Sequence, residues 1–117
     1  MRVRFLLFTA ILAACGGADN SPTSPPTTNK TVDIFTVGDA FSPISPTLSA
    51  GDTARWNFSG GSDGMGHNVR FTPAVAGAPS DISVLKTGTA TRVFSTRGDF
   101  KYVCDVHPGM NAEIIVQ

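Results

Sequence analysis

Apolar and polar residues alternate over short stretches from residue 31 to the C-terminus. Residues 53–58 place alanine, tryptophan and phenylalanine on one face, and residues 67–71 place His67 on one face with a valine and a phenylalanine, because side chains alternate along a strand. Further strands are predicted at residues 31–37, 91–96, 100–104 and 112–116. Residues 81–86 fit either a strand or a helical turn. Glycine, proline and aspartate turns separate these stretches, and such a set predicts an all-β sandwich.

The N-terminal fifteen residues follow a different pattern. Residues 1–4 carry two arginines, and residues 5–14 form an uncharged, largely apolar run that ends at Cys15. This order is typical of a secretory signal, and the run is too short to span a bilayer core of about 30 Å. The segment Leu-Ala-Ala-Cys at 12–15 is similar to the bacterial lipobox. We therefore predict a lipoprotein signal at 1–14 and lipidation of Cys15. The alternative is an ordinary signal peptide in which Cys15 has no role.

A low-hydrophobicity segment follows the predicted signal. Residues 16–30 contain no aliphatic or aromatic side chain larger than alanine and are rich in proline, serine and threonine, so they cannot build a core. We predict that residues 15–30 are a lipidated cysteine and a tether that spans roughly 20–45 Å. Residues 31–117 remain as one small domain with a single core.

Composition and charge narrow the class of protein further. Thirteen threonines and ten valines stand against three lysines and one glutamate, which disfavours helices. Nine basic and nine acidic residues give a formal net charge of zero, which gives no electrostatic basis for nucleic-acid binding. From residue 31 onward there are six basic and eight acidic residues, a net charge of −2, so electrostatic steering of partners should be weak.

Cys104 begins a short segment rich in metal-binding side chains. Cys15 and Cys104 could form a disulfide or act separately, and the assignment of Cys15 to the signal favours separate roles. Residues 104–110 read Cys-Asp-Val-His-Pro-Gly-Met, which places a thiol, an imidazole and a thioether at Cys104, His107 and Met110. Because proline and glycine are unfavourable inside a helix, these residues must form a tight loop that surrounds one point.

The chemistry of these donors indicates copper. Thiolate, imidazole and thioether are soft or borderline ligands, which suit copper alternating between Cu(I) and Cu(II). Structural zinc sites take four Cys or His ligands, and Met is not among them. His67, predicted to point inward, can supply a second imidazole, with Met110 as a weak axial donor. Considered singly, His67 would be a hydrogen-bonded core residue and Cys104 a small buried hydrophobe.

Four segments and a closing apolar strand carry a more specific pattern. They are Gly-Asp-Thr at 51–53 leading to Trp56, Gly-His-Asn-Val at 66–69, Gly-Asp-Phe-Lys-Tyr-Val-Cys at 98–104, and His-Pro-Gly-Met at 107–110. Together they resemble the cupredoxins, the blue copper proteins of the plastocyanin, pseudoazurin and amicyanin group. The short Cys-x2-His-x2-Met spacing is most similar to amicyanin. The resemblance implies a Greek-key β-sandwich or barrel that holds one type 1 copper, with His67, Cys104 and His107 as equatorial ligands and Met110 as the axial ligand.

The resemblance also assigns roles to two neighbours of the ligands. Asn68, which follows the first histidine, would tie the two ligand segments together by hydrogen bonds. The alternative for Asn68 is a plain exposed strand residue. Asp105 stands where the relatives commonly have serine or threonine. An unscreened carboxylate there would favour Cu(II) and lower the reduction potential.

Electron transfer is the function that the resemblance implies. Four ligands leave no open position for a substrate, so we expect a non-enzymatic carrier that shuttles single electrons outside the cytoplasmic membrane. In the family the second histidine reaches the surface through an apolar patch. Here His107 and Pro108 would form the electron port, framed by Gly109 and by Met65, although Met65 fits equally well as a loop residue without a role.

The expected partners are transient protein redox partners that dock over a small area. We expect a monomer, no nucleic-acid partner, and membrane contact only through a lipid on Cys15 of an exported, periplasmic or cell-surface protein. The alternative function is periplasmic copper delivery or buffering, which the same ligand set would also permit.

Overall fold

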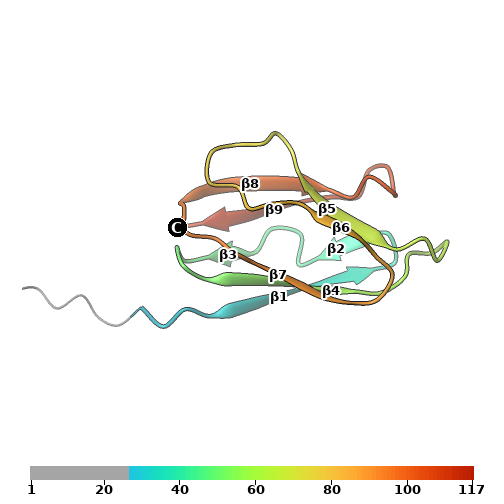
Figure 1. Cartoon of the computed structure of the whole chain (residues 1–117), viewed down its shortest axis with the longest axis horizontal. Coiled ribbons are helices and arrows are strands. Elements are labelled where there is room, and N and C mark those ends of the chain that lie inside the picture. Colours follow the sequence, from blue (N-terminus) through green and yellow to red (C-terminus); the bar gives the residue numbers. More distant parts are fainter. Residues whose placement is uncertain (1–26) are drawn as a thin grey trace, which may run out of the picture.

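The computed structural model describes residues 27–117, so the predictions for the signal and for Cys15 lie outside the described residues. Within this range the chain forms nine strands and no helix. Figure 1 shows the strands packed in two layers. Residues 27–117 contain no helix that is long and apolar enough to cross a membrane.

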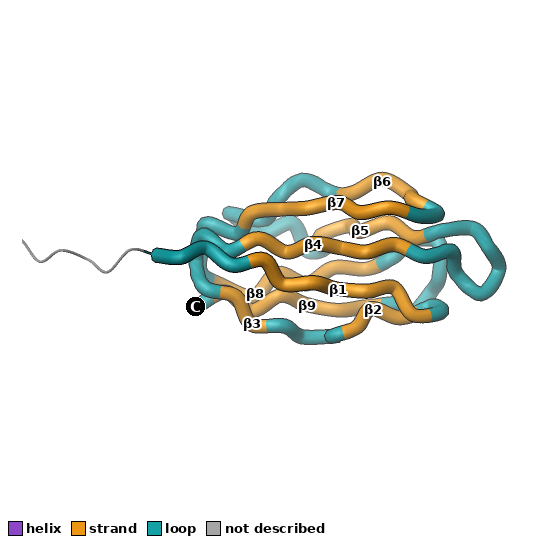
Figure 2. Tube along the Cα trace, turned by 90° about the horizontal axis from the view of Figure 1, so that it is seen from below, coloured by secondary structure: helices purple, strands orange, loops and turns teal. Residues whose placement is uncertain are grey.

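Each layer is one hydrogen-bonded sheet. The first sheet has the order β2 (Ala40–Ser42), β1 (Thr31–Val37), β4 (Thr53–Phe58) and β7 (Gly88–Val93). The second has the order β3 (Thr47–Leu48), β9 (Asn111–Val116), β8 (Gly98–Val103), β5 (His67–Phe71) and β6 (Ile82–Leu85). β1 is parallel to β4 and β3 is parallel to β9, whereas the other neighbours are antiparallel. Because several neighbours in a sheet are far apart in sequence, the chain crosses repeatedly between the layers (Figure 2). The predicted all-β sandwich is confirmed.

The predicted strands agree with the structure where alternation is clear. Residues 53–58 and 67–71 are strands as predicted, and the ambiguous residues 81–86 contain strand β6. The prediction for residues 91–96 is wrong in its bounds. β7 begins at Gly88 and pairs with β4 as far as Val93, after which Phe94 turns away to exchange backbone hydrogen bonds with the segment before β4.

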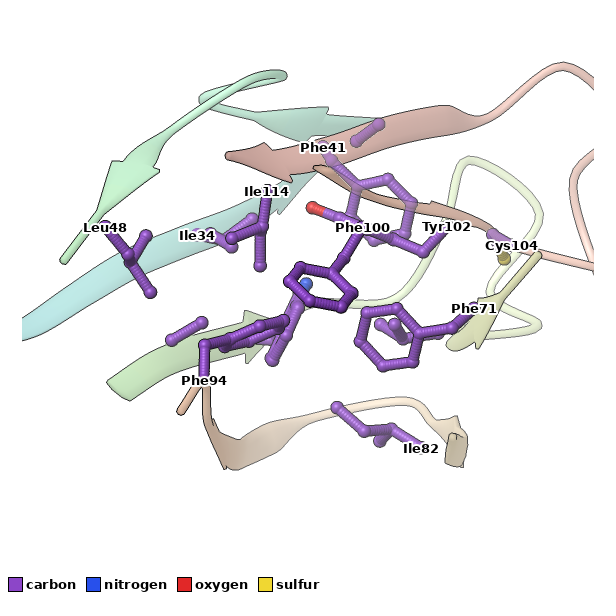
Figure 3. Close-up of a cluster of buried hydrophobic side chains, with 14 of the residues drawn as sticks. Ile34, Phe41, Leu48, Phe71, Ile82, Phe94, Phe100, Tyr102, Cys104 and Ile114 are labelled. Carbon is purple, nitrogen blue, oxygen red and sulfur yellow. The ribbon is translucent and has the colours of Figure 1, made fainter. Parts of the chain in front are cut away.

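Aromatic side chains fill the space between the sheets. Trp56 from β4 and Tyr102 from β8 are both fully buried, and their rings meet edge to face with centroids 5.7 Å apart. Phe71 packs edge to face against both rings. Burial of each such side chain stabilises the fold by about 1.5–3 kcal/mol. The period of two over residues 100–104 predicts that Cys104 points inward with Phe100 and Tyr102. Figure 3 shows Cys104 beside Phe71 and Tyr102, so this prediction is confirmed and the thiol lies at one end of the core.

The chain enters the sandwich at the end opposite Cys104. Asp52 is only 2% exposed and accepts hydrogen bonds from the backbone N–H groups of Lys30 (2.9 Å) and Ser49 (2.8 Å). Thr53 donates in turn to the carbonyl of Lys30. Figure 1 shows that this end also carries the C-terminus, whereas the β4–β5 and β8–β9 loops lie at the other end.

Candidate metal centre

Three buried donors converge from two strand ends. His67 is the first residue of β5, and Cys104 follows the last residue of β8 directly. His107 lies in the loop 104–110 that joins β8 to β9. The exposed fractions are 0% for His67, 3% for Cys104 and 7% for His107. Their donor atoms all lie within 4.8 Å of one another. The predicted inward direction of His67 is therefore confirmed, and the structure brings these three predicted residues together.

The distances between the donors fit a shared metal ion. The Sγ of Cys104 lies 3.8 Å from Nδ1 of His67 and 3.7 Å from Nδ1 of His107. With metal–sulfur and metal–nitrogen bonds of about 2.3 Å and about 2.0 Å at a trigonal angle, sulfur and nitrogen would lie about 3.7 Å apart. Both nitrogens face the sulfur, as ligation of one ion requires. The three residues therefore fit a single metal.

The surroundings of Cys104 favour the thiolate, which is the metal-binding form. Burial raises the pKa of the Cys104 thiol, but the backbone N–H of Asn68 and hydrogen bonds from His107 and Val106 together lower it below its usual value. Thiolate, two imidazoles and a nearby thioether are the donor types that copper prefers. The chemistry of the donor set therefore fits copper.

The surroundings shift the pKa values of the two histidines in opposite directions. Burial, followed by the positive charge of a protonated His107, lowers the pKa of His67. The hydrogen bond with Cys104, followed by that with Asp63, raises the pKa of His107. The neutral form, which is the form that binds a metal, is thus favoured at His67 and disfavoured at His107. The buried Nε2 of His67 has no hydrogen-bond partner among the described residues.

Met110 closes the loop that carries Cys104 and His107. Its side chain is 3% exposed. The N–H of Cys104 donates to the carbonyl of Met110 at 2.9 Å, and the N–H of Met110 donates to the carbonyl of His107 at 3.1 Å. Gly109 adopts φ +86° between them, a conformation that glycine allows at little cost. The loop is therefore fixed by its own backbone, and Met110 lies on the buried side of it.

Asn68 and Asp105 connect the two ligand segments. Asn68 donates from Nδ2 to the Asp105 carboxylate at 2.9 Å and accepts from the Asp105 backbone N–H at 2.7 Å. The same carboxylate pairs with the Arg70 guanidinium, at 2.9 Å from Nε and 2.7 Å from Nη2. Arg70, followed by Asn68, lowers the pKa of Asp105. The Asp105 charge is therefore compensated by Arg70, a partner that the sequence prediction missed although Arg70 lies on the same face of the strand as Asn68.

The outer edge of His107 also has neighbours that were not predicted. Its Nε2 lies 3.1 Å from Oδ1 of Asp63 and 3.4 Å from Oδ1 of Asp39. Met65, expected either in an apolar frame around the electron port or as a loop residue without a role, is 57% exposed. Asp63 lies in the glycine-rich segment 59–66, and the sequence carries no signal that its carboxylate meets His107.

Comparisons with known proteins agree with this geometry. Residues 36–117 match the family model of copper-binding proteins of the plastocyanin/azurin family. No curated protein matches the chain. The family match covers most of the described residues and includes the whole donor set.

Solved structures with similar folds include several copper proteins. A reduced Cu(I) form at pH 4 of an amicyanin mutant has 25% identity and a TM-score of 0.63, over 74% of this chain and 82% of that one. A copper-containing nitrite reductase from Thermus scotoductus SA-01 has 22% identity and a TM-score of 0.63, over 74% of this chain. The chain spans only 22% of that reductase. The likeness to the reductase is one of fold, and the identity of the metal donors rests on the geometry given above.

Proposed function

The chain belongs to the plastocyanin/azurin family of copper-binding proteins, and from this premise we propose that it carries single electrons between redox partners outside the cytoplasmic membrane. The cupredoxin fold and the group of His67, Cys104 and His107 fit one type 1 copper. The observation that carries the proposal is the enclosure of this group, because all three donors are less than 10% exposed.

The ligand roles follow from the donor atoms. His67 and His107 would bind through Nδ1, Cys104 through its thiolate and Met110 through its thioether as a weak axial donor. Copper held there supplies one-electron chemistry by alternating between Cu(I) and Cu(II). The backbone hydrogen bonds of the loop 104–110 hold the donors in place, and Asn68 fixes that loop to β5. A site that moves little between oxidation states suits electron transfer.

Burial of the donors also supports a carrier rather than an enzyme. A substrate that bound to the metal would have to displace a ligand or enter between side chains that are 0–7% exposed. The nitrite reductase of similar fold is several times longer than this chain. We therefore propose that the chain has no catalytic activity of its own.

The position of the N-terminal segment supports an outward-facing copper site. The described chain begins at the end of the sandwich opposite the loop 104–110 (Figure 1). A tether at residues 15–30, anchored through Cys15, would leave the copper end free to meet partners. Mass spectrometry of the native N-terminus tests the anchor, and an unmodified Cys15 or its absence from the mature protein would refute it.

Electron self-exchange of the copper-loaded protein tests the proposed function. We expect rapid self-exchange by NMR line broadening and retention of Cu(I) against a chromophoric chelator, because the donors are enclosed and held by the fold. Slow self-exchange together with ready loss of Cu(I) would instead indicate copper delivery or buffering. The Cys104→Ser variant is the matched control, since it should lose the site in both assays.

A further inference from the structure

Asp39, Gly61 and Asp63 lie against the outer edge of His107. Together with Ser62, which hydrogen-bonds to Asp39, we call them the His107 cap. A Cβ placed on Gly61 would lie 2.6 Å from both Cε1 and Nε2 of the ring. The backbone of the β4–β5 loop therefore lies directly against the imidazole. The ring edge that would reach the surface in an open site is only slightly exposed here.

The hydrogen bond between His107 and Asp63 has a defined direction. Nδ1 of His107 faces Cys104 at 3.7 Å, so a metal held there leaves the proton on Nε2. Nε2–H then donates to Oδ1 of Asp63 at 3.1 Å, with Oδ1 of Asp39 at 3.4 Å as a second negatively charged neighbour. The imidazole is thus placed between a metal position and a carboxylate.

The two carboxylates are themselves held in position. Asp39 accepts hydrogen bonds from the backbone N–H and the hydroxyl of Ser62, at 3.0 and 2.6 Å. Asp63 accepts from the backbone N–H of Met65 at 2.8 Å. The hydrogen bonds between Ser62 and Asp39 tie the β4–β5 loop to the β1–β2 turn. Neither aspartate pairs with a lysine or arginine among the described residues, so the negative charge faces the histidine.

We propose that Asp63, supported by Asp39, is a positioning residue for the copper ligand His107. A carboxylate that accepts the distal N–H of a ligating histidine fixes its tautomer and ring orientation and makes the ligating nitrogen more basic. A more basic nitrogen stabilises Cu(II) more than Cu(I). The cap therefore lowers the reduction potential and tightens copper binding. It also gives redox partners a polar surface of carboxylate and backbone groups over the electron port. The inference rests on the proposed ligation of copper by His107.

Two sets of variants test this role. In Asp63→Ala we expect the Cu(II) affinity to fall by about 10–100-fold, the usual effect of removing such a partner. The reduction potential should rise by about 59 mV for each tenfold by which the Cu(II) affinity falls more than the Cu(I) affinity. Asp63→Asn, which keeps an acceptor but loses the charge, should show a smaller rise. Asp99→Ala is the control, because Asp99 is an exposed residue of β8 that pairs with Ile115 near the other end of the sandwich.

The second set tests the contact between the loop backbone at Gly61 and the His107 ring. Gly61→Ala should push the loop away from the ring and shift the potential in the same direction as Asp63→Ala. Gly60→Ala is the matched control, because the nearest heavy atom to its added Cβ would be 3.8 Å away. Thermal unfolding of each variant confirms that it folds.

Three outcomes would overturn the inference. The first is a copper affinity and potential in both Asp63 variants equal to those of the unmodified protein. The second is a Gly61→Ala variant that behaves like Gly60→Ala. The third comes from 15N NMR of the copper-free protein, where we expect the Nε2 resonance of His107 to differ between the unmodified protein and Asp63→Ala, because the carboxylate contacts that nitrogen. No difference would contradict the role. Failure of the proposed function is distinct, because the unmodified protein would then bind no copper, while the NMR comparison would still decide the role of Asp63.

Discussion

Gly109 offers a sharp test of whether the protein itself fixes its ligand loop. Gly109 has φ +86°, and a Cβ added there would meet no heavy atom within 4 Å. The cost of Gly109→Ala is therefore only that of a left-handed backbone, about 1–2 kcal/mol. For a domain of this size that cost corresponds to a decrease in melting temperature of about 4–16 °C.

The cost should fall equally on the copper-free and copper-loaded protein. The hydrogen bonds from Cys104 to Met110 and from Met110 to His107 are made by the backbone, so the loop does not depend on a metal for its conformation. We expect calorimetry to show the decrease in both forms and competition titration to show a copper affinity within about twofold of the unmodified protein. Gly109→Asn is the control, because asparagine tolerates positive φ better than alanine, and it should recover part of the loss.

One result would refute this reasoning. If Gly109→Ala left the melting temperature of the copper-free protein unchanged but lowered copper affinity by tenfold or more, the cost would arise only on metal binding. The loop 104–110 would then take its conformation from the metal. A factor of ten corresponds to about 1.4 kcal/mol, within the range of the expected backbone cost.

Three further predictions concern the charge beside Cys104, the packing of the core and an ion pair away from the site. Voltammetry should show a lower reduction potential in Arg70→Gln, because the Asp105 carboxylate then lacks its partner charge, and a higher potential in Asp105→Asn. The double variant should have a nearly unchanged potential. Shifts of the same sign in both single variants would contradict this prediction. Val69→Ala removes two methyl groups from a fully buried side chain and should lower the free energy of unfolding by about 2–3 kcal/mol. The control is Val93→Ala, at a side chain that is 57% exposed, which should lower it by less than about 0.5 kcal/mol. Equal losses in urea titrations would refute the assignment of the core. The Arg55 guanidinium, which hydrogen-bonds to Asp33, lowers the pKa of Asp33 from 3.8 to about 2. The contribution of Asp33 to stability is therefore complete above about pH 4 and is lost as the pH falls through 2. Asp33→Asn should flatten the acid limb of the stability curve in that window, and an unchanged limb would contradict the prediction.

The fold could be predicted well wherever alternation is regular. β4 and β5 follow a strict period of two, and that period also indicated that His67 and Cys104 point inward. β2 and β3 were not predicted, because strands of two or three residues show no period. Their existence depends on partners, as in the pairing of Thr47 with Ile115, which lie far away in sequence.

The proposed metal donors could be predicted because three of the four, Cys104, His107 and Met110, carry unusual chemistry at close spacing. The charged neighbours of these donors could not be predicted from the sequence. Asp63 and His107 are 44 residues apart, and Arg70 and Asp105 are 35 apart, so the spacing of these residues contains no sign that they meet. The contacts arise only once β5 and β8 pair and the loops at their ends come together.

The visible absorption spectrum of the purified protein with one equivalent of Cu(II) tests the central claim most directly. Thiolate from Cys104 bound to Cu(II) should give an intense blue charge-transfer band at a stoichiometry of one copper per chain, and Cys104→Ser should abolish it. The same spectrum would contradict the account if copper bound without colour and without stoichiometry, or if the band survived in Cys104→Ser.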